Sequence, residues 1–396
     1  MQRADPLALP PVPPPAPATH RWRDAMLAAG FCVALGAGGF GALRTPPQSA
    51  LEFEFRARAP WPSLTPSRTF PGEFERAFAD RFGVRDPLLR LHHATMAGLF
   101  GVSPAPNVLI GRNDWLYFVG EDGKALERHF RGTLPVADAE IAAVVAELKR
   151  RQQFLASLGV VYVVTIVPDK FSVYPENLPA WVGPPHAPTP LARLAAALKD
   201  DGGVRFVDLR APLAEAKARR RAYYATDSHW NMIGAAAGYD AIMREVQRAL
   251  PPGSLATLTP AAMPPYDPAV DFYAGDLARQ LGFPARYREP DYAPFAKVLG
   301  EPGARCAKRT DTGADEGFEF YACAQPGLPR AVVYRDSMAI PLIPLLSENF
   351  SRAVYVGSRR LDPALILREK PDVVIEEMVE RSLLAPAALP MPPAPK

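Results

Sequence analysis

Cysteine and histidine are scarce in this chain, with 3 cysteines and 6 histidines among 396 residues. They form no Cys-x-x-Cys pair and no Cys/His cluster, so the sequence offers no zinc site of the usual kind. An excess of one charge is lacking too, because 45 basic and 42 acidic residues leave a net charge of +3. No basic stripe interleaved with aromatic residues is present, which argues against nucleic acid as a partner. We also expect no cofactor.

Long apolar runs are absent except near the N-terminus. Residues 25–43 carry no charge, and this segment is about as long as the ~20 residues that a membrane-spanning helix needs. Because Arg21 and Arg23 precede it, the sequence predicts a transmembrane signal anchor over residues 21–45 with its N-terminus in the cytoplasm. The segment is only moderately hydrophobic, so a cleaved signal peptide is the alternative.

Proline, in contrast, is abundant, with 46 residues. Many prolines lie in two tails, residues 1–20 and 386–396, which we interpret as extended, solvated segments, the first of them cytoplasmic. Residues 46–69 also carry several prolines and little periodicity, as is typical of a linker. Between the linker and the second tail we predict one domain, residues 70–385.

Two of the three cysteines, Cys306 and Cys323, follow the predicted anchor. If that part of the chain lies outside the cytoplasm, an oxidising compartment would allow them to form a disulfide. Two free buried thiols are the alternative.

Short β-branched runs alternate with helical periodicity through most of the predicted domain. Residues 160–167 are apolar or β-branched throughout, as in a strand that is buried on both faces. Further strands are predicted at residues 204–209, 331–334, 353–356 and 373–375, a hairpin at 108–118, and helices at 71–100, 138–158, 190–199, 211–220, 344–350 and 363–369. This alternation predicts an α/β fold whose mostly parallel sheet has helices on both faces. Residues 251–330 lack the pattern and are interpreted as irregular.

Asp227 and His229 lie two positions apart in a polar loop. An aspartate that accepts a hydrogen bond from one imidazole nitrogen fixes the tautomer and leaves the other nitrogen as a proton acceptor. The pair is therefore half of a catalytic triad. The alternative is that Thr226, Asp227 and Ser228 cap the following helix, because such residues are favoured just before an apolar-periodic run.

A nucleophile for this base is predicted in the turn after the strand at residues 331–334. Ser337 lies where this strand runs into a helix, and sites in such sheets lie at the carboxyl ends of strands. Its backbone N–H and the helix N-terminus could stabilise an oxyanion, and His229 is the predicted base. The alternative is that Asp336 and Ser337 only cap the next helix.

Several short motifs around these residues are more specific than the triad itself. They are residues 82–86, 111–118, 168–170 with 174–176, 226–231, 275–277, 370–375 and 379–381. In these motifs and in their order, the chain resembles the alginate O-acetyltransferase (AlgJ/AlgX) family, whose domain is SGNH hydrolase-like. The resemblance extends over most of residues 70–385.

The resemblance implies a triad of Asp227, His229 and Ser337 and an acetyl-serine intermediate that is handed to a hydroxyl of an exopolysaccharide. It also implies a periplasmic domain anchored in the inner membrane, and a membrane-bound O-acyltransferase partner that supplies acetyl groups. The chain departs from the family at Met338, where an aromatic residue is common, and at Asp169, where asparagine is common. Neither departure removes a member of the triad.

The oxyanion and substrate contacts are less well defined by the sequence. Arg335, Trp230 and Asn231 are candidates because they neighbour the triad residues. Two further functions stay open. One is a carbohydrate esterase of the same fold, which differs only in using water as the acceptor. The other is a non-catalytic polysaccharide-binding subunit of an exopolysaccharide assembly machine.

Overall fold

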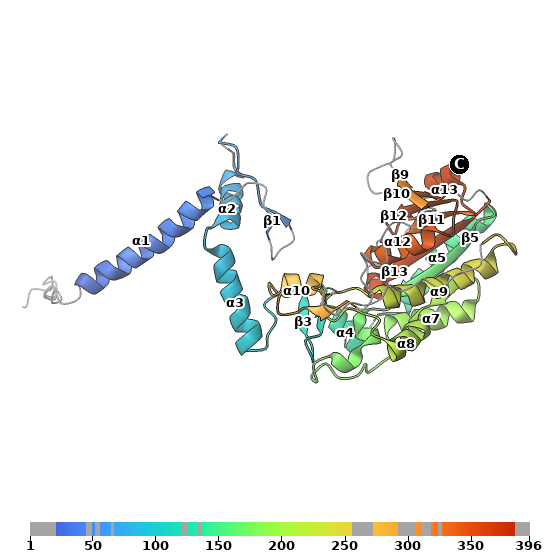
Figure 1. The fold of residues 1–396 in the computed structure, drawn as a ribbon, viewed down its shortest axis with the longest axis horizontal. Helices are drawn as coiled ribbons and strands as arrows, with labels where there is room; N and C mark the ends of the chain where they lie inside the picture. Colours follow the sequence, from blue (N-terminus) through green and yellow to red (C-terminus); the bar gives the residue numbers. More distant parts are fainter. Residues whose placement is uncertain are drawn as a thin grey trace, which may run out of the picture. The chain divides into compact units, whose positions relative to one another are not determined.

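The computed structural model describes residues 21–44, 50–51, 56–64, 67–120, 125–133, 136–255, 272–291, 306–309, 318–323 and 327–384. The chain divides into two compact units, Met1–Thr95 and Met96–Lys396 (Figure 1). The two predicted proline-rich tails lie outside the described residues. The domain boundaries predicted from the sequence stay predictions.

The smaller unit is mainly helical. Its elements are α1 (Arg21–Arg44), β1 (Ala50–Leu51), β2 (Arg56–Ala57), α2 (Phe70–Arg81) and the start of α3 (Arg85–Leu99). Phenylalanines four residues apart share one face of α2, and the rings of Phe74 and Phe78 stack with centroids 6.1 Å apart. The predicted transmembrane segment forms α1, but within the described part of the chain no helix is both long and apolar enough to cross a membrane. The predicted anchor is therefore not supported.

The larger unit is built on a seven-stranded sheet with the order β6-β5-β13-β11-β12-β10-β9. The strands are β5 (Val161–Val167), β6 (Arg205–Asp208), β9 (Cys306–Arg309), β10 (Phe318–Cys323), β11 (Arg330–Tyr334), β12 (Arg352–Val356) and β13 (Val373–Val379). From β6 to β12 every neighbouring pair is parallel, and β13 lies between β5 and β11. The predicted α/β fold with a mostly parallel sheet is therefore confirmed.

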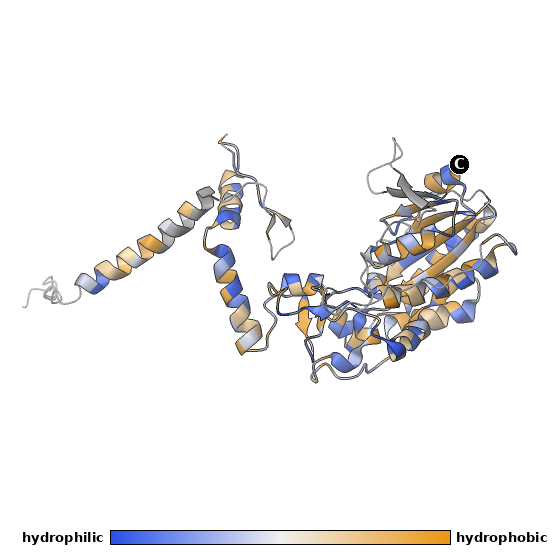
Figure 2. Cartoon of the chain, in the orientation of Figure 1, coloured by the Kyte–Doolittle hydropathy of each residue, from blue (hydrophilic) through white to orange (hydrophobic). Residues whose placement is uncertain are grey.

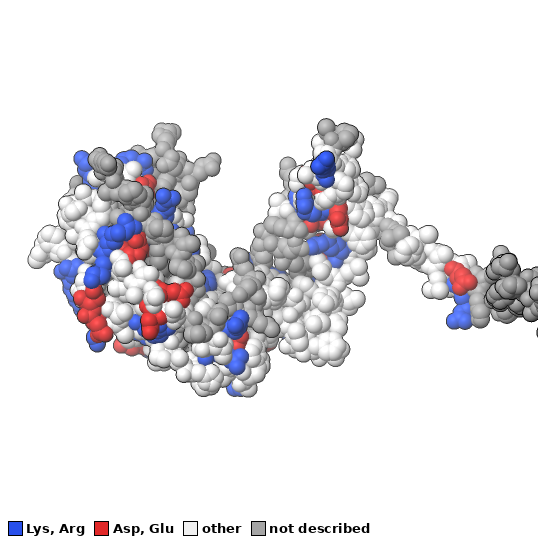
Figure 3. Space-filling view, turned by 180° about the vertical axis from the view of Figure 1, so that it is seen from behind, with Lys and Arg blue, Asp and Glu red and all other residues white. Residues whose placement is uncertain are grey.

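Helices cover both faces of this sheet (Figure 1). Successive side chains of a strand point to opposite faces, so Val163 packs in one core and Val164 in the other. The first core includes side chains from α8 (Arg210–Arg219), α9 (Met232–Ala249) and α12 (Ile343–Ser347), and the second from α5 (Asp138–Ser157), α7 (Pro190–Asp201) and α13 (Pro363–Glu369). The central strands are mainly hydrophobic, whereas the helices carry both hydrophobic and hydrophilic residues (Figure 2). On the face drawn in Figure 3, basic and acidic side chains of this unit are interspersed.

The stretch predicted as irregular, residues 251–330, contributes two strands to the sheet. β10 pairs antiparallel with β12, and β9 pairs antiparallel with β10 at the edge. The interpretation of this stretch as wholly irregular is therefore wrong. The backbone register places Cys306 directly opposite Cys323, a separation that a disulfide can bridge. The side chains of both cysteines lie outside the described part, so the disulfide stays a prediction.

The predicted hairpin is confirmed and supports the loop that carries Asp227. It consists of β3 (Val108–Ile110) and β4 (Leu116–Phe118), which pair antiparallel. The buried Lys170 joins hairpin and loop, because its Nζ donates to the carbonyl oxygens of Leu116 at 2.6 Å and Ala225 at 3.1 Å. Burial lowers the pKa of Lys170 to about 8.

Candidate active site

Asp227 and His229 are joined by two hydrogen bonds in the loop between α8 and α9. Asp227 Oδ1 accepts from the backbone N–H of His229 at 2.9 Å and from its ring Nδ1 at 2.6 Å. Because Nδ1 faces a carboxylate, it carries the ring proton, and Nε2 is left as an acceptor. The predicted orientation of the imidazole by Asp227 is thus present in the structure.

The helix that follows this loop is capped by a different residue. α9 begins at Met232, and the side-chain oxygen of Asn231 accepts from the backbone N–H groups of Ile233 at 3.0 Å and Gly234 at 3.2 Å. The alternative in which Thr226, Asp227 and Ser228 cap the helix is therefore wrong. Asp227 lies too far upstream to reach the free N–H groups of the first turn.

Ser337 lies beside His229 although the two are far apart in sequence. It is the first residue of the 3-10 helix η3 (Ser337–Leu342), which follows β11, and its Oγ is 2.9 Å from His229 Nε2. The preceding Asp336 does cap this helix, since its carboxylate accepts from the backbone N–H groups of Met338 and Val379, both at 2.8 Å. Asp336 thus fixes the turn, while the exposed Ser337 presents its hydroxyl to the imidazole.

Electrostatics favour an ionised Asp227 and a readily protonated His229. Burial disfavours the carboxylate of Asp227, but hydrogen bonds from His229, Asp276 and Tyr273 outweigh it and hold its pKa well below the usual range. Burial also disfavours the imidazolium of His229. The hydrogen bond and the charge of Asp227 outweigh that effect, so the pKa of His229 is raised. The pair can therefore hold the proton that a nucleophile gives up.

A pocket of about 310 Å³ opens over these side chains. Its lining consists of Tyr224, Asp227, His229, Trp230, Asn231, Met232, Tyr273, Asp276, Arg279, Ser337, Ile340 and Pro341. The rings of Tyr224 and Tyr273 stack in it with centroids 4.1 Å apart. The pocket thus brings together the serine, the imidazole, an aromatic wall and one arginine.

The three residues predicted to contact the oxyanion or the substrate, Trp230, Asn231 and Arg335, use their side chains mainly for contacts within the protein. Trp230 is buried, and its Nε1 donates to the carbonyl oxygen of Met338 at 2.7 Å. Asn231 uses its oxygen in the cap and donates from Nδ2 to the carbonyl oxygen of Arg221 at 2.8 Å. Arg335 does not line the pocket, and it makes a 3.5 Å contact with the carbonyl oxygen of Asp336. Trp230 and Asn231 therefore shape the pocket through internal bonds, and a direct substrate contact by any of the three stays a prediction.

Tyr273 and Asp276 belong to the site although reasoning from the residues alone missed them. Tyr273 Oη donates to Asp227 Oδ2 at 2.7 Å, and the backbone N–H of Asp276 donates to the same oxygen at 2.9 Å. Their segment has no periodicity that would place it, and only the short motif at residues 275–277 marked it. Gly275 permits the approach, because a Cβ there would lie 2.2 Å from the carbonyl oxygen of Thr226.

A metal ion could in principle use the same cluster. Asp227, His229 and Asp276 each offer a ligand atom, and these atoms lie within 4.8 Å of one another. All three groups, however, are already joined to each other or to neighbouring N–H and O–H groups. The contacts in the described residues therefore fit an oriented imidazole better than a metal site.

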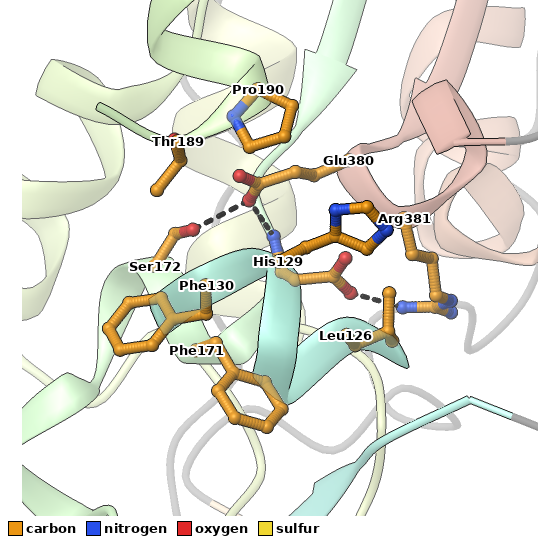
Figure 4. Close-up of a pocket in the computed structure, with 10 residues that line it drawn as sticks. Leu126, His129, Phe130, Phe171, Ser172, Thr189, Pro190, Glu380 and Arg381 are labelled. Atoms are coloured by element: carbon orange, nitrogen blue, oxygen red, sulfur yellow. Dashed lines mark hydrogen bonds and ion pairs between the residues drawn. The ribbon is translucent and has the colours of Figure 1, made fainter. Parts of the chain in front are cut away.

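A second, smaller pocket of about 30 Å³ lies at the ends of β5 and β13 (Figure 4). The side chain of Glu380 borders it and accepts from Ser172 Oγ at 2.7 Å and from the backbone N–H of Asp169 at 2.8 Å. Asp169 in turn pairs with Arg381 at 2.5 Å, so the residue that departs from the family carries an ion pair. Burial, helped by the charge of Asp169, raises the pKa of Glu380 to about 7.

Glu380→Gln is expected to flatten the pH dependence of stability. The ordinary pKa of Glu380 is 4.5 and the folded value is about 7, so between these values the folded state holds a proton that the unfolded state has lost. The stability from this group is full below about pH 4.5 and is lost as the pH rises through about 7, up to about 3 kcal/mol. Glutamine keeps an acceptor oxygen and does not titrate. Urea unfolding of both proteins at about pH 5 and about pH 8 measures the difference, and an equal difference at both pH values would contradict the assignment.

The family model described as "SGNH hydrolase-like domain, acetyltransferase AlgX" matches residues 108–304. The resemblance to the AlgJ/AlgX family is confirmed. The matched part of this AlgJ/AlgX-like chain contains Asp227 and His229 and ends before Ser337.

Curated relatives of this AlgJ/AlgX-like chain carry the name "Probable alginate O-acetylase AlgJ". The one from Azotobacter vinelandii is 30% identical over 162 residues, which are 41% of this chain and 39% of the relative. The one from Pseudomonas putida is 29% identical over 241 residues, which are 60% of this chain and 56% of the relative. The chain thus spans about half the length of the curated relatives it matches, or less.

Two solved structures have a similar course of the chain. The O-acetyltransferase domain of Pseudomonas putida AlgJ is 22% identical in sequence and has a TM-score of 0.46. The alignment covers 70% of this chain and 92% of that one. Bacillus cereus PatB1 is 17% identical in sequence and has a TM-score of 0.46. The alignment covers 70% of this chain and 96% of PatB1.

Proposed function

We propose that this protein is an O-acetyltransferase that moves an acetyl group through Ser337 onto a hydroxyl of an acidic exopolysaccharide of the alginate type. The observation that carries the proposal is the hydrogen-bonded series from Asp227 through His229 to Ser337 at the floor of an open pocket. The curated relatives named alginate O-acetylase support the choice of reaction.

The proposed acyl transfer through a serine follows the order of the three hydrogen-bonded side chains. His229 Nε2 takes the proton from Ser337 Oγ as the oxygen attacks the acetyl donor, and Asp227 stabilises the imidazolium that forms. The same imidazolium returns its proton to the leaving group. In the second half of the reaction, neutral His229 deprotonates the acceptor hydroxyl, which attacks the acetyl-serine. The bond between the acetyl carbon and Ser337 Oγ then breaks, and the imidazolium returns its proton to this oxygen.

The pocket also offers features that suit a sugar acid. Stacked Tyr224 and Tyr273 form an aromatic wall, and Arg279, an exposed residue of α10 (Asp276–Gln280), lines the same pocket. A guanidinium binds a carboxylate well because its planar donors match two oxygens. Arg279 is thus suited to the carboxylate of a uronate polymer.

Trapping of the acetyl-enzyme tests the proposal. The full chain is incubated with an activated acetyl ester and its intact mass is measured, followed by peptide mapping. We expect one added acetyl group on Ser337, absent from Ser337→Ala. Addition of alginate oligosaccharides should then transfer the group to sugar, with less release as acetate.

Each other result of this experiment has a definite meaning. Acetate release that alginate or other oligosaccharides do not redirect would favour an esterase. No adduct and no ester turnover in the wild-type protein would contradict enzymatic activity and favour a polysaccharide-binding subunit.

We further propose that the domain works in the periplasm and receives acetyl groups from a membrane-bound O-acyltransferase partner. The family resemblance supports this, because an extracytoplasmic enzyme would lack direct access to cytoplasmic acetyl donors. Recovery of the full chain in the cytosolic fraction of cells would contradict the location.

A further inference from the structure

A short segment far from Asp227 in sequence closes over the loop that carries it. This segment comprises β7 (Phe272–Tyr273) and α10, and it gives Asp227 Oδ2 its two hydrogen bonds, from Tyr273 Oη at 2.7 Å and from the backbone N–H of Asp276 at 2.9 Å. His229 uses the other carboxylate oxygen, Oδ1. One carboxylate oxygen of Asp227 thus binds the base, and the other binds this segment.

The carboxylate of Asp276 lies next to the imidazole without competing for its proton. Its Oδ1 accepts from the backbone N–H of Ser228 at 2.7 Å and its Oδ2 from Ser228 Oγ at 2.6 Å. Its Oδ2 is 3.8 Å from His229 Nδ1, too far for a hydrogen bond but close enough for a strong interaction between charges. Asp276 is therefore a second negative charge that faces His229.

We propose that Tyr273 and Asp276 are positioning residues that change the proton affinity of His229 in opposite directions. Asp276 increases this affinity, and Tyr273 decreases it. The charge of Asp276 stabilises the imidazolium. The hydroxyl of Tyr273 neutralises part of the charge on Asp227 and so weakens its attraction for the imidazolium. The catalytic consequence rests on the proposed function, whereas the effect on His229 does not.

Other charged and titratable groups face this cluster from neighbouring elements. Arg381 in η4 (Glu380–Leu384) opposes protonation of His229, and buried Lys170 in α6 (Lys170–Val173) interacts with both Asp227 and Asp276. Burial and the neighbouring charge of Asp227 raise the pKa of Asp276, as expected for a second carboxylate beside the first. Neither Arg381 nor Lys170 is altered in the variants below, so their contributions cancel in the comparison.

Two conservative substitutions separate the two effects. Asp276→Asn keeps the size of the side chain and an acceptor oxygen for Ser228 but removes the charge. Tyr273→Phe keeps the ring that stacks on Tyr224 but removes the hydroxyl. A matched control is Tyr224→Phe, which removes a hydroxyl that contacts Asp291 at 3.3 Å.

The measurement is an NMR titration of the full chain labelled with ¹³C-histidine, in which His229→Ala assigns one of the 6 histidine signals. We expect the pKa of His229 to fall by about one unit in Asp276→Asn and to rise by roughly half a unit in Tyr273→Phe. Tyr224→Phe should leave it unchanged. Shifts of the same sign in both variants, or no shift in Tyr273→Phe, would overturn the proposal. Tyr273→Phe removes no charge, so it tests the proposal even if Asp276→Asn does not fold.

Activity gives a second and independent readout. The acid limb of the pH profile for acetyl-enzyme formation should move to lower pH in Asp276→Asn and to higher pH in Tyr273→Phe. A purely structural role would lower the rate without moving either limb. If the wild-type chain forms no acetyl-enzyme, the proposed function fails, and the titration still decides the roles of Tyr273 and Asp276.

Discussion

Alanine in place of either His229 or Ser337 is expected to reduce kcat for acetyl transfer by about 10⁴-fold or more. The reason is that Ser337 Oγ and His229 Nε2, 2.9 Å apart, act as one unit, in which a serine without a base is a weak nucleophile. The double variant should therefore be no slower than either single variant. Steady-state kinetics with an activated acetyl ester and an oligosaccharide acceptor measure all three.

The comparison includes a control for the loss of a histidine as such. His92 is an exposed residue of α3, and His92→Ala should leave kcat unchanged. Effects of the two active-site substitutions that multiply in the double variant would show that His229 and Ser337 act independently, and the proposed mechanism would then be wrong.

Loss of a buried charge in the sheet should give the largest effect on stability. Arg151 on α5 and Glu376 on β13 are fully buried and paired at 2.6 Å, and Tyr162 also donates to Glu376. Glu376→Gln removes the fully buried counter-charge of Arg151 and leaves the guanidinium with Glu147, 3.0 Å from its Nε, as its remaining carboxylate partner. The free energy of unfolding should therefore fall by about 3 kcal/mol, the lower end of the usual range for a broken buried pair. Urea unfolding of the full chain measures this difference.

An exposed pair provides the matched control. Arg205 and Glu245 lie 3.3 Å apart with side chains 48% and 21% exposed, and Glu245→Gln should cost less than about 1 kcal/mol. Combined replacement of Arg151 by methionine and Glu376 by leucine should recover much of the lost stability, because no charge then stays buried. Equal effects of Glu376→Gln and Glu245→Gln would contradict the importance of burial.

The parallel part of the sheet could be predicted because its strands carry their own signal. β5 and β13 are buried on both faces, so the sequence must be apolar or β-branched over most of each strand. β9 and β10 were not predicted from the sequence, because their pairing depends on the neighbouring strand β12 and not on a local pattern of residues. Phe318–Cys323 alternates polar and apolar residues only briefly, within a stretch rich in glycine and charge.

The part of the site that could be predicted consists of residues that are close together in sequence or directly follow a recognisable strand. Asp227 and His229 are two residues apart, and Ser337 follows a recognisable strand, so topology alone brings them to one edge of the sheet. Tyr273 and Asp276 contact Asp227 across 46 and 49 residues. No periodicity in their segment encodes that contact. The capping role of Asn231 was missed for a simpler reason, since several adjacent polar residues could each have filled it.

The order of strands in the sheet has a consequence for how the protein is made. β13 is the last strand among the described residues but pairs between β5 and β11 near the centre of the sheet. At about 5–20 residues per second, the ribosome adds the 108 residues from His229 to Ser337 in roughly 5–20 s. The base and its nucleophile therefore emerge at separate times, and the sheet that joins them cannot close until β13 has also left the ribosome. A nascent chain that has not yet reached β13 is thus expected to lack the closed sheet that holds Ser337 beside His229.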